Sequence, residues 1–163
     1  MTDPKYPLVT ALSTFDAVIL CDGDYPSHPI PLSILNQAPY LVCCDGAGMN
    51  HILHGGTPDA IVGDGDSLPE DFKRRYADIL HIVNEQEDND QTKATRFCIA
   101  KGCRRIAYLG STGKREDHAL SNISLTMRYH RLIGDNNSQI TALVNQLDCL
   151  GDSFYQFKAI NMA

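Results

Sequence analysis

The chain lacks the features that would mark a membrane, secreted or nucleic-acid-binding protein. No apolar run approaches the roughly 18 residues of a membrane span, and residues 1–4 do not read as a signal peptide. With 14 Lys and Arg against 20 Asp and Glu, the formal charge is −6. No basic cluster is large enough to dominate a phosphate backbone. We therefore expect a cytoplasmic protein that binds neither nucleic acid nor membranes.

The chain also lacks any CxxC pair, although it contains six cysteines. Most of these cysteines lie inside apolar runs. We interpret them as reduced thiols of a protein core rather than as a disulfide framework, which fits a cytosolic chain. Internal repeats and low-complexity tracts are absent as well, and 163 residues with 43% hydrophobic content are enough for one core.

Apolar runs typical of buried strands alternate with segments that have helical features. This alternation predicts an α/β fold, a three-layer α/β/α arrangement around a mostly parallel, Rossmann-like sheet of about six strands. In the helix expected at 118–132, we expect Leu120, Ile123, Leu125 and Met127 to pack inward. The expected strands are 15–20, 40–44, 59–62, 79–83, 106–109 and 140–144, and the other expected helices are 29–37, 45–54, 69–76 and 91–101.

Polar residues follow four of these strands. Because parallel strands have their carboxyl ends at one edge of a sheet, the exit loops should meet there. The informative residues are Asp45, then Asp64 with Asp66, then the run 86–90, then the run 115–118.

Asp64 and Asp66 flank Gly65 directly after a buried strand, so both carboxylates should reach the same place. Two such oxygen ligands suit Mg²⁺, which proteins hold with one or two carboxylates together with substrate phosphates. The alternative is ordinary turn chemistry, since Asp, Gly and Ser are common in loops. An EF-hand is excluded because Pro69 and Arg75 stand where that loop needs Gly and Glu.

Two segments of the sequence resemble nucleotide-binding motifs without matching them. The run 110–115 resembles a P-loop, yet Tyr108 and Arg115 occupy positions that require Gly and Ser or Thr. The run 45–48 lacks the GxGxxG spacing of a dinucleotide fold. What remains is an acidic cluster with Lys93, Lys114 and Arg115 nearby, a combination suited to phosphoryl transfer because that chemistry depends on positioning and charge stabilisation.

Four motifs in one order resemble those of the thiamine pyrophosphokinase family. They are residues 45–47, 63–67, 86–93 and 113–118, the last together with Asn122, and they span about 15–133 of the chain. The resemblance implies transfer of a pyrophosphoryl group from ATP to the hydroxyethyl group of thiamine, giving thiamine diphosphate and AMP. It also implies Mg²⁺ as cofactor and a homodimer.

The resemblance implies roles for individual residues. Asp64, Asp66 and Asp90 fall on the metal-binding aspartates, and we count Lys93, Arg115 and Asp117 with them as catalytic, with Asp117 or Asp90 accepting the alcohol proton. Departures include Gly65, where the family usually has Phe. Nucleotide and phosphate contacts are expected from Asp45, Gln86, Asn89, Lys93, Arg115 and His118.

The length of the chain departs from the family pattern. The family adds a C-terminal β-sandwich that helps to form the thiamine pocket across a homodimer. We expect this element to be largely absent from the present chain, which would be either shortened or built with a different pocket. We expect residues 1–145 to form the catalytic α/β domain. Residues 146–163 would be a remnant or the start of a C-terminal β element, because Phe154, Tyr155 and Phe157 suggest a strand.

Other functions remain open at this stage. A related pyrophosphokinase acting on a hydroxymethyl-pterin would use the same loops. A metal-dependent nucleotide-sugar transferase with an Asp-x-Asp motif would use Asp64 and Asp66 but leaves 86–93 and 115–118 unexplained. A non-catalytic nucleotide-binding module is the third alternative. Arg115 could also be a surface residue paired with Glu116 or Asp117.

Overall fold

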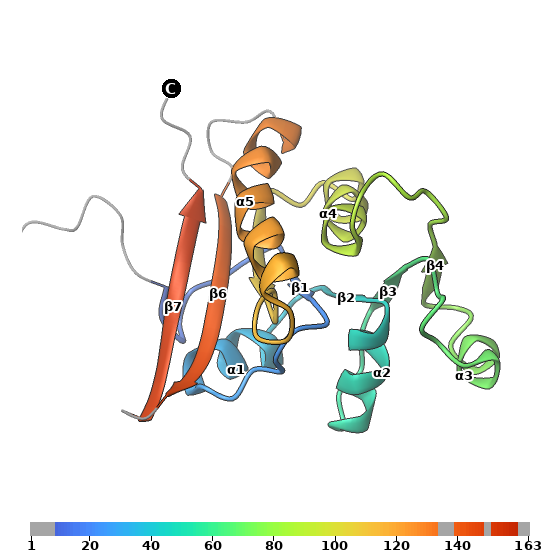
Figure 1. The fold of residues 1–163 in the computed structure, drawn as a ribbon, viewed down its shortest axis with the longest axis horizontal. Helices are drawn as coiled ribbons and strands as arrows, with labels where there is room; N and C mark the ends of the chain where they lie inside the picture. The colour runs from blue at the N-terminus through green and yellow to red at the C-terminus, as the bar shows by residue number, and fades with distance from the viewer. Residues whose placement is uncertain (1–8, 134–138, 149–150, 160–163) are drawn as a thin grey trace, which may run out of the picture.

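A seven-stranded sheet forms the centre of the protein, in a computed structural model that describes residues 9–133, 139–148 and 151–159 (Figure 1). The strand order is β4-β3-β2-β1-β5-β6-β7. The first six strands are parallel to their neighbours, and β7 is antiparallel to β6. The strands are β1 (Ala17–Leu20), β2 (Leu41–Cys44), β3 (Ala60–Gly63), β4 (Leu80–Ile82), β5 (Arg105–Leu109), β6 (Gln139–Asp148) and β7 (Gly151–Ala159).

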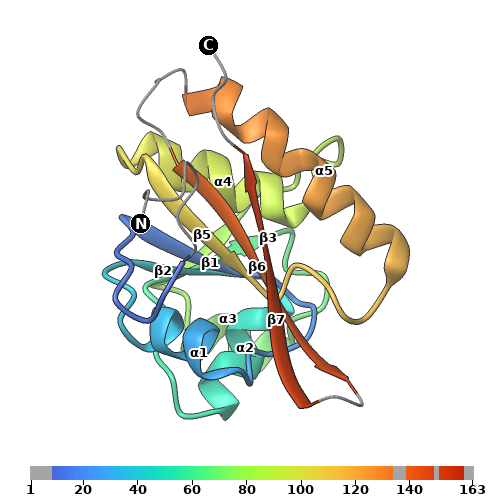
Figure 2. The same ribbon diagram turned by 90° about the vertical axis from the view of Figure 1, so that its left-hand side faces the viewer.

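Helices cover both faces of this sheet (Figure 2). α1 (Pro29–Asn36), α2 (Gly46–Leu53) and α3 (Glu70–Arg75) pack on one face, and α4 (Asp90–Ala100) and α5 (Glu116–Ile133) pack on the other. The predicted three-layer α/β/α fold with a mostly parallel sheet is therefore confirmed. The predicted strands and helices lie at the observed positions, with ends that differ by a few residues.

The central strands are apolar throughout because each of their faces meets a helical layer. In β1, Ala17 and Ile19 belong to the core under α4 and α5, whereas Val18 and Leu20 belong to the core over α1 and α2. All four side chains are at most 1% exposed. Continuous apolar runs of this kind made the strands recognisable in the sequence.

Two details differ from the expectations. Leu120 is 71% exposed, so the prediction that it packs inward was wrong; Thr126 and Tyr129 are among the buried residues of α5 instead. Met127 was also expected to pack inward, but its side chain lies outside the part of the chain that the structure describes. The seventh strand comes from the tail, where β7 pairs with β6 from Ile140 to Asp148. The division into 1–145 and 146–163 falls inside β6 and stays a prediction.

The strand order places a topological switch point between β1 and β5. The chain moves outward from β1 through β2, β3 and β4, then crosses back to β5 on the other side of β1. At such a point the two adjacent exit loops diverge to opposite faces, which opens a crevice at the carboxyl edge of the sheet where open α/β folds bind ligands. Among the described residues, no helix is both long and apolar enough to cross a membrane.

Candidate active site

A cleft of about 580 Å³ opens at the carboxyl edge of the sheet, across the switch point. Its wall includes residues from the exit loops of β1, β2, β3, β4 and β5, so the convergence expected from the sequence takes place. The predicted residues that line it are Asp45, Asp64, Asp66, Gln86, Asn89, Asp90, Lys93, Arg115 and His118. Asp117, also predicted, is not among the lining residues.

Asp45 follows β2 directly and is the N-cap residue of α2, and it is only 7% exposed. Its φ of 39° lies in the left-handed region, which Asp tolerates better than most residues. The Ser67 hydroxyl donates a hydrogen bond to Asp45 Oδ2 over 2.6 Å. Asp45 Oδ1 is buried without a hydrogen-bond partner in the described part of the chain. A buried carboxylate oxygen in this condition costs free energy unless a cation or donor meets it.

Asp64 and Asp66 lie on the loop that follows β3. The backbone N–H of Asp66 donates to Asp64 Oδ1 over 3.0 Å, which fixes the short turn. Gly65 between them has a φ of 78°, and a Cβ added there would lie 2.7 Å from Ile82 Cδ1. A side chain at this position would strain the backbone and push aside the end of the Ile82 side chain, so the loop in this chain favours glycine where the family usually has phenylalanine.

Asp90 and Lys93 come from the first turn of α4, which begins with Asn89 as its N-cap. Asn89 Oδ1 accepts a hydrogen bond from the backbone N–H of Thr92, which satisfies one free donor of the helix end. The Lys93 side chain is 4% exposed, and its Nζ lies 3.6 Å from Asp90 Oδ1. Burial raises the pKa of Asp90, and the nearby charges of Asp45 and Asp64 raise it further, against the opposing effect of Lys93.

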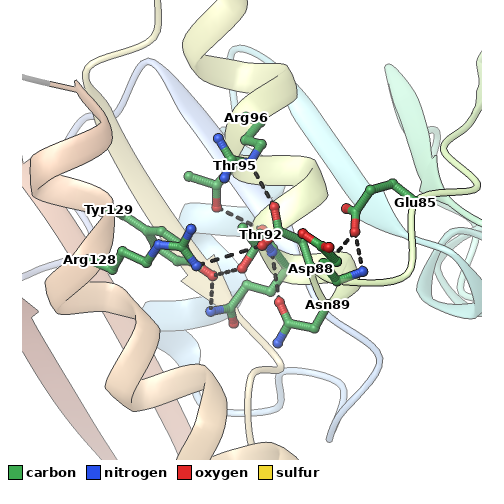
Figure 3. Close-up of polar contacts among 10 residues, drawn as sticks. Glu85, Asp88, Asn89, Thr92, Thr95, Arg96, Arg128 and Tyr129 are labelled. Carbon is green, nitrogen blue, oxygen red and sulfur yellow. Dashed lines mark hydrogen bonds and ion pairs between the residues drawn. The ribbon is translucent and has the colours of Figure 1, made fainter.

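A layer of polar contacts behind the cleft holds the start of α4 in place (Figure 3). Asp88 accepts a hydrogen bond from Arg96 Nε over 2.8 Å, and Arg128 Nη1 of α5 lies 3.6 Å from its other oxygen. The Tyr129 hydroxyl is 2.9 Å from the Thr92 hydroxyl. Because Arg128 and Tyr129 belong to α5, these contacts fix α4 and α5 relative to each other.

The loop from β5 to α5 supplies the basic side of the cleft. Lys114 Nζ donates to Asp22 Oδ1 over 3.2 Å and so spans the switch point between the β1 and β5 exits. Arg115 donates to both oxygens of Asp117, with Nη2 to Oδ2 at 2.6 Å and Nε to Oδ1 at 3.1 Å. The hydrogen bond to Arg115 lowers the pKa of Asp117, and the same pairing raises the pKa of Arg115. Arg115 thus lines the cleft with its guanidinium already paired.

Sequence reasoning missed several residues of the cleft. Asp22 and Gly23 follow β1, and Ser111 and Thr112 follow β5. The signal that could have found Asp22 was present, because it stands after a buried strand just as Asp45 and Asp64 do. The described part of the chain has no group of three or more His, Cys, Asp or Glu side chains already gathered tightly enough to hold a metal ion.

Comparison with known proteins identifies the family. The family model for thiamin pyrophosphokinase, catalytic domain, matches residues 32–139. The chain belongs to this family. Thiamine pyrophosphokinase 1 of Oryza sativa subsp. japonica is 27% identical over 158 residues, covering 80% of this chain and 58% of the rice protein.

Solved thiamin pyrophosphokinases share the fold. The Bacillus subtilis enzyme superposes with a TM-score of 0.58 and 23% identity over 77% of this chain and 59% of that one. Yeast thiamin pyrophosphokinase superposes with a TM-score of 0.60 and 14% identity over 85% of this chain and 64% of that one. The chain thus spans about three fifths of the length of the relatives that it matches.

Proposed function

We propose that the chain carries the catalytic part of a thiamine pyrophosphokinase, which transfers the pyrophosphoryl group of ATP to the hydroxyethyl group of thiamine and releases AMP. One observation carries the proposal beyond family membership. Carboxylates from four strand exits and the cations Lys93, Lys114 and Arg115 line a single cleft at the switch point. A metal–triphosphate complex needs these two kinds of group side by side.

The cleft residues fit a magnesium ion by the chemistry of their donor set. Asp64, Asp66 and Asp90 offer carboxylate oxygens, and Asp45 adds a buried oxygen without a partner. The charges of Asp45 and Asp64 raise the pKa of Asp90, so these groups repel one another in the absence of a cation. Bound Mg²⁺ would neutralise triphosphate oxygens. We propose Asp64, Asp66 and Asp90 as its protein ligands.

The remaining residues would offset the charge of the triphosphate and hold it in position. Lys93 is held at the base of the cleft by burial and by Asp90, and so offers a fixed positive charge to a phosphate oxygen. Arg115 would exchange its pairing with Asp117 for a bidentate contact to the triphosphate. Gln86, Asn89 and His118 also line the cleft and supply hydrogen-bonding groups. Of the two proposed proton acceptors, Asp90 lies in the cleft whereas Asp117 does not line it.

Product identification tests this proposal. The protein is incubated with ATP, Mg²⁺ and thiamine, and the nucleotide and thiamine products are separated. We expect AMP and thiamine diphosphate in equal amounts, and neither in the Asp64→Asn variant prepared in parallel, which controls for contaminating enzymes. Formation of ADP, or ATP binding without turnover, contradicts the proposal. AMP formed only with a hydroxymethyl-pterin as acceptor would keep the reaction type and replace the substrate.

A homodimer is a further part of the proposal and rests on the family resemblance alone. It is tested by sedimentation of the protein with and without Mg²⁺ and ATP, and a monomer under both conditions contradicts it. The cytoplasmic location expected from the sequence stays a prediction.

A further inference from the structure

A pair of cysteines lies at the end of α4 that is remote from the cleft. The helix ends in a turn in which Gly102 has a φ of 88°. The Gly102 N–H donates to the carbonyl of Ile99 over 2.9 Å, and the Cys103 N–H donates to the carbonyl of Cys98 over 3.1 Å. These two bonds define a Schellman motif. In that motif, the side chains at the positions of Cys98 and Cys103 meet, and the contact is usually between two apolar residues.

Here the two residues that meet are both thiols. Cys98 belongs to the core under α4 and α5, and Cys103 packs against that same core. The two cysteines differ in solvent exposure, because Cys98 is 0% exposed and Cys103 is half-buried. Of the five cysteines that the structure describes, Cys103 is the one that solvent reaches; Cys21, Cys43, Cys44 and Cys98 are buried.

The surroundings of Cys103 favour its thiolate. The hydrogen bond from Cys98, assisted by the positive charge of Lys101, lowers the pKa of Cys103 to about 7, against the opposing effects of burial and of Asp16. The Lys101 Nζ lies over the Phe97 ring, 5.1 Å from its centre. The same hydrogen bond and burial raise the pKa of Cys98, so it stays a thiol. An accessible thiolate beside a buried thiol is the arrangement that lets oxidation proceed to a disulfide.

We propose that Cys98 and Cys103 form a peroxide-sensitive dithiol, in which Cys103 reacts first and Cys98 closes the disulfide. The Cys103 thiolate attacks one oxygen of hydrogen peroxide, the O–O bond breaks, and hydroxide leaves, which yields a sulfenic acid. The Cys98 sulfur then attacks the Cys103 sulfur, the S–S bond forms and the S–O bond breaks. The leaving hydroxide takes the Cys98 proton. Two thiols lose two electrons, and one peroxide becomes two waters; a dithiol reductant reverses the change.

Mass spectrometry of the intact chain and of its tryptic peptides tests the proposal. After brief treatment with hydrogen peroxide, we expect the intact protein to lose about 2 Da and to recover it with dithiothreitol. Iodoacetamide then blocks the remaining free thiols of the oxidised protein before digestion. Trypsin cuts after Arg96, Lys101 and Arg104, so the disulfide should join peptide 97–101 to peptide 102–104. A disulfide from Cys103 to another cysteine overturns the proposal, as does a Cys103 sulfinic acid beside an alkylated Cys98.

Three variants sharpen the test. Cys103→Ser should abolish the joined peptide. Cys98→Ser should leave a Cys103 sulfenic acid that dimedone labels more strongly than it labels the wild type. Cys43→Ala removes a buried thiol from the opposite face of the sheet and should leave the joined peptide at its wild-type yield. An unchanged loss of mass in Cys103→Ser, or an unlabelled Cys103 in Cys98→Ser, contradicts the proposed order of reaction.

Discussion

Arg115 lies in the cleft and is also part of an ion pair. Its side chain lines the cleft, and two of its guanidinium nitrogens donate hydrogen bonds to Asp117. Both partners are solvent-exposed, with side chains 66% and 63% exposed, so the pair adds little to stability. Under the proposed function, a triphosphate would therefore displace Asp117 at small cost. The alternative raised from the sequence, a surface residue paired with Asp117, agrees with the pairing in the structure.

The Arg115→Lys variant tests whether Arg115 acts on the triphosphate or only pairs with Asp117. Lysine keeps the charge but loses the planar fork that grips two oxygens, so we expect the turnover rate to fall by about tenfold or more while the KM for ATP changes less. Steady-state kinetics measure both. Arg74→Lys on the exposed surface of α3 is the matched control and should match the wild type. An unchanged turnover rate in Arg115→Lys would remove Arg115 from the proposed site.

The carboxylates on the loop after β3 carry a separate prediction. An amide binds Mg²⁺ much less well than a carboxylate, so Asp64→Asn and Asp66→Asn should each lower turnover by orders of magnitude. The fold should persist, because neither residue belongs to the hydrophobic core. Activity is measured beside far-ultraviolet circular dichroism. Near-normal turnover in both variants would rule out the metal assignment.

At the scale of elements, amide side chains join α4, α5 and the loop after β5. Asn122 on α5 accepts from Asn89 Nδ2 over 2.9 Å and donates through Nδ2 to the carbonyl of Ser111 over 2.9 Å. Gln91 Nε2 donates to the backbone carbonyl of Asn122, and its Oε1 accepts from the Ser111 hydroxyl. The three segments that line one side of the cleft are thus held by a shared network.

The Asn122→Ala variant tests how much this network contributes to the stability of the fold. It removes two side-chain hydrogen bonds, each with a net worth of about 1 kcal/mol, so we expect the free energy of unfolding to fall by about 1–2 kcal/mol. Urea denaturation measures the change. Ser121→Ala, one residue away and exposed on the same helix, should stay within about 0.5 kcal/mol of the wild type. Equal stability in the two variants would show that the network is not required.

At the scale of the whole molecule, the charge of the cleft couples ligand binding to stability. The carboxylates repel one another when no cation is bound, so a metal–nucleotide complex that binds only the folded chain should stabilise it. At a Mg²⁺–ATP concentration about 100 times its Kd, the gain is about 2.7 kcal/mol. Thermal unfolding with Mg²⁺–ATP, and again after chelation with EDTA, measures it. Asp64→Asn should lose most of the gain, whereas Asp78→Asn, an exposed turn residue, should keep it.

The sequence by itself determined the elements and the positions of their exits. Runs such as 15–20 and 40–44 are apolar throughout because both faces of a covered parallel sheet are buried, and that local property is readable from composition. The same reading placed Asp45, Asp64 and Asp90 just after strands. It failed for Leu120, because apolar residues on a helix do not by themselves say which face the neighbouring elements cover.

Only the tertiary structure decided which exit loops lie beside each other and which partners each side chain contacts. The order β4-β3-β2-β1-β5 sets β1 beside β5, and this brings Asp22 to Lys114 across 92 positions of sequence. Tertiary packing also buries the Lys93 side chain, whose distance to Asp90 is set by helix spacing, and leaves Asp45 Oδ1 without a partner in the described chain. Strand order depends on contacts between distant segments, which local periodicity does not encode. For that physical reason the sequence predicted that the exit loops gather at one edge of the sheet, whereas it did not show which loops lie beside each other in the cleft.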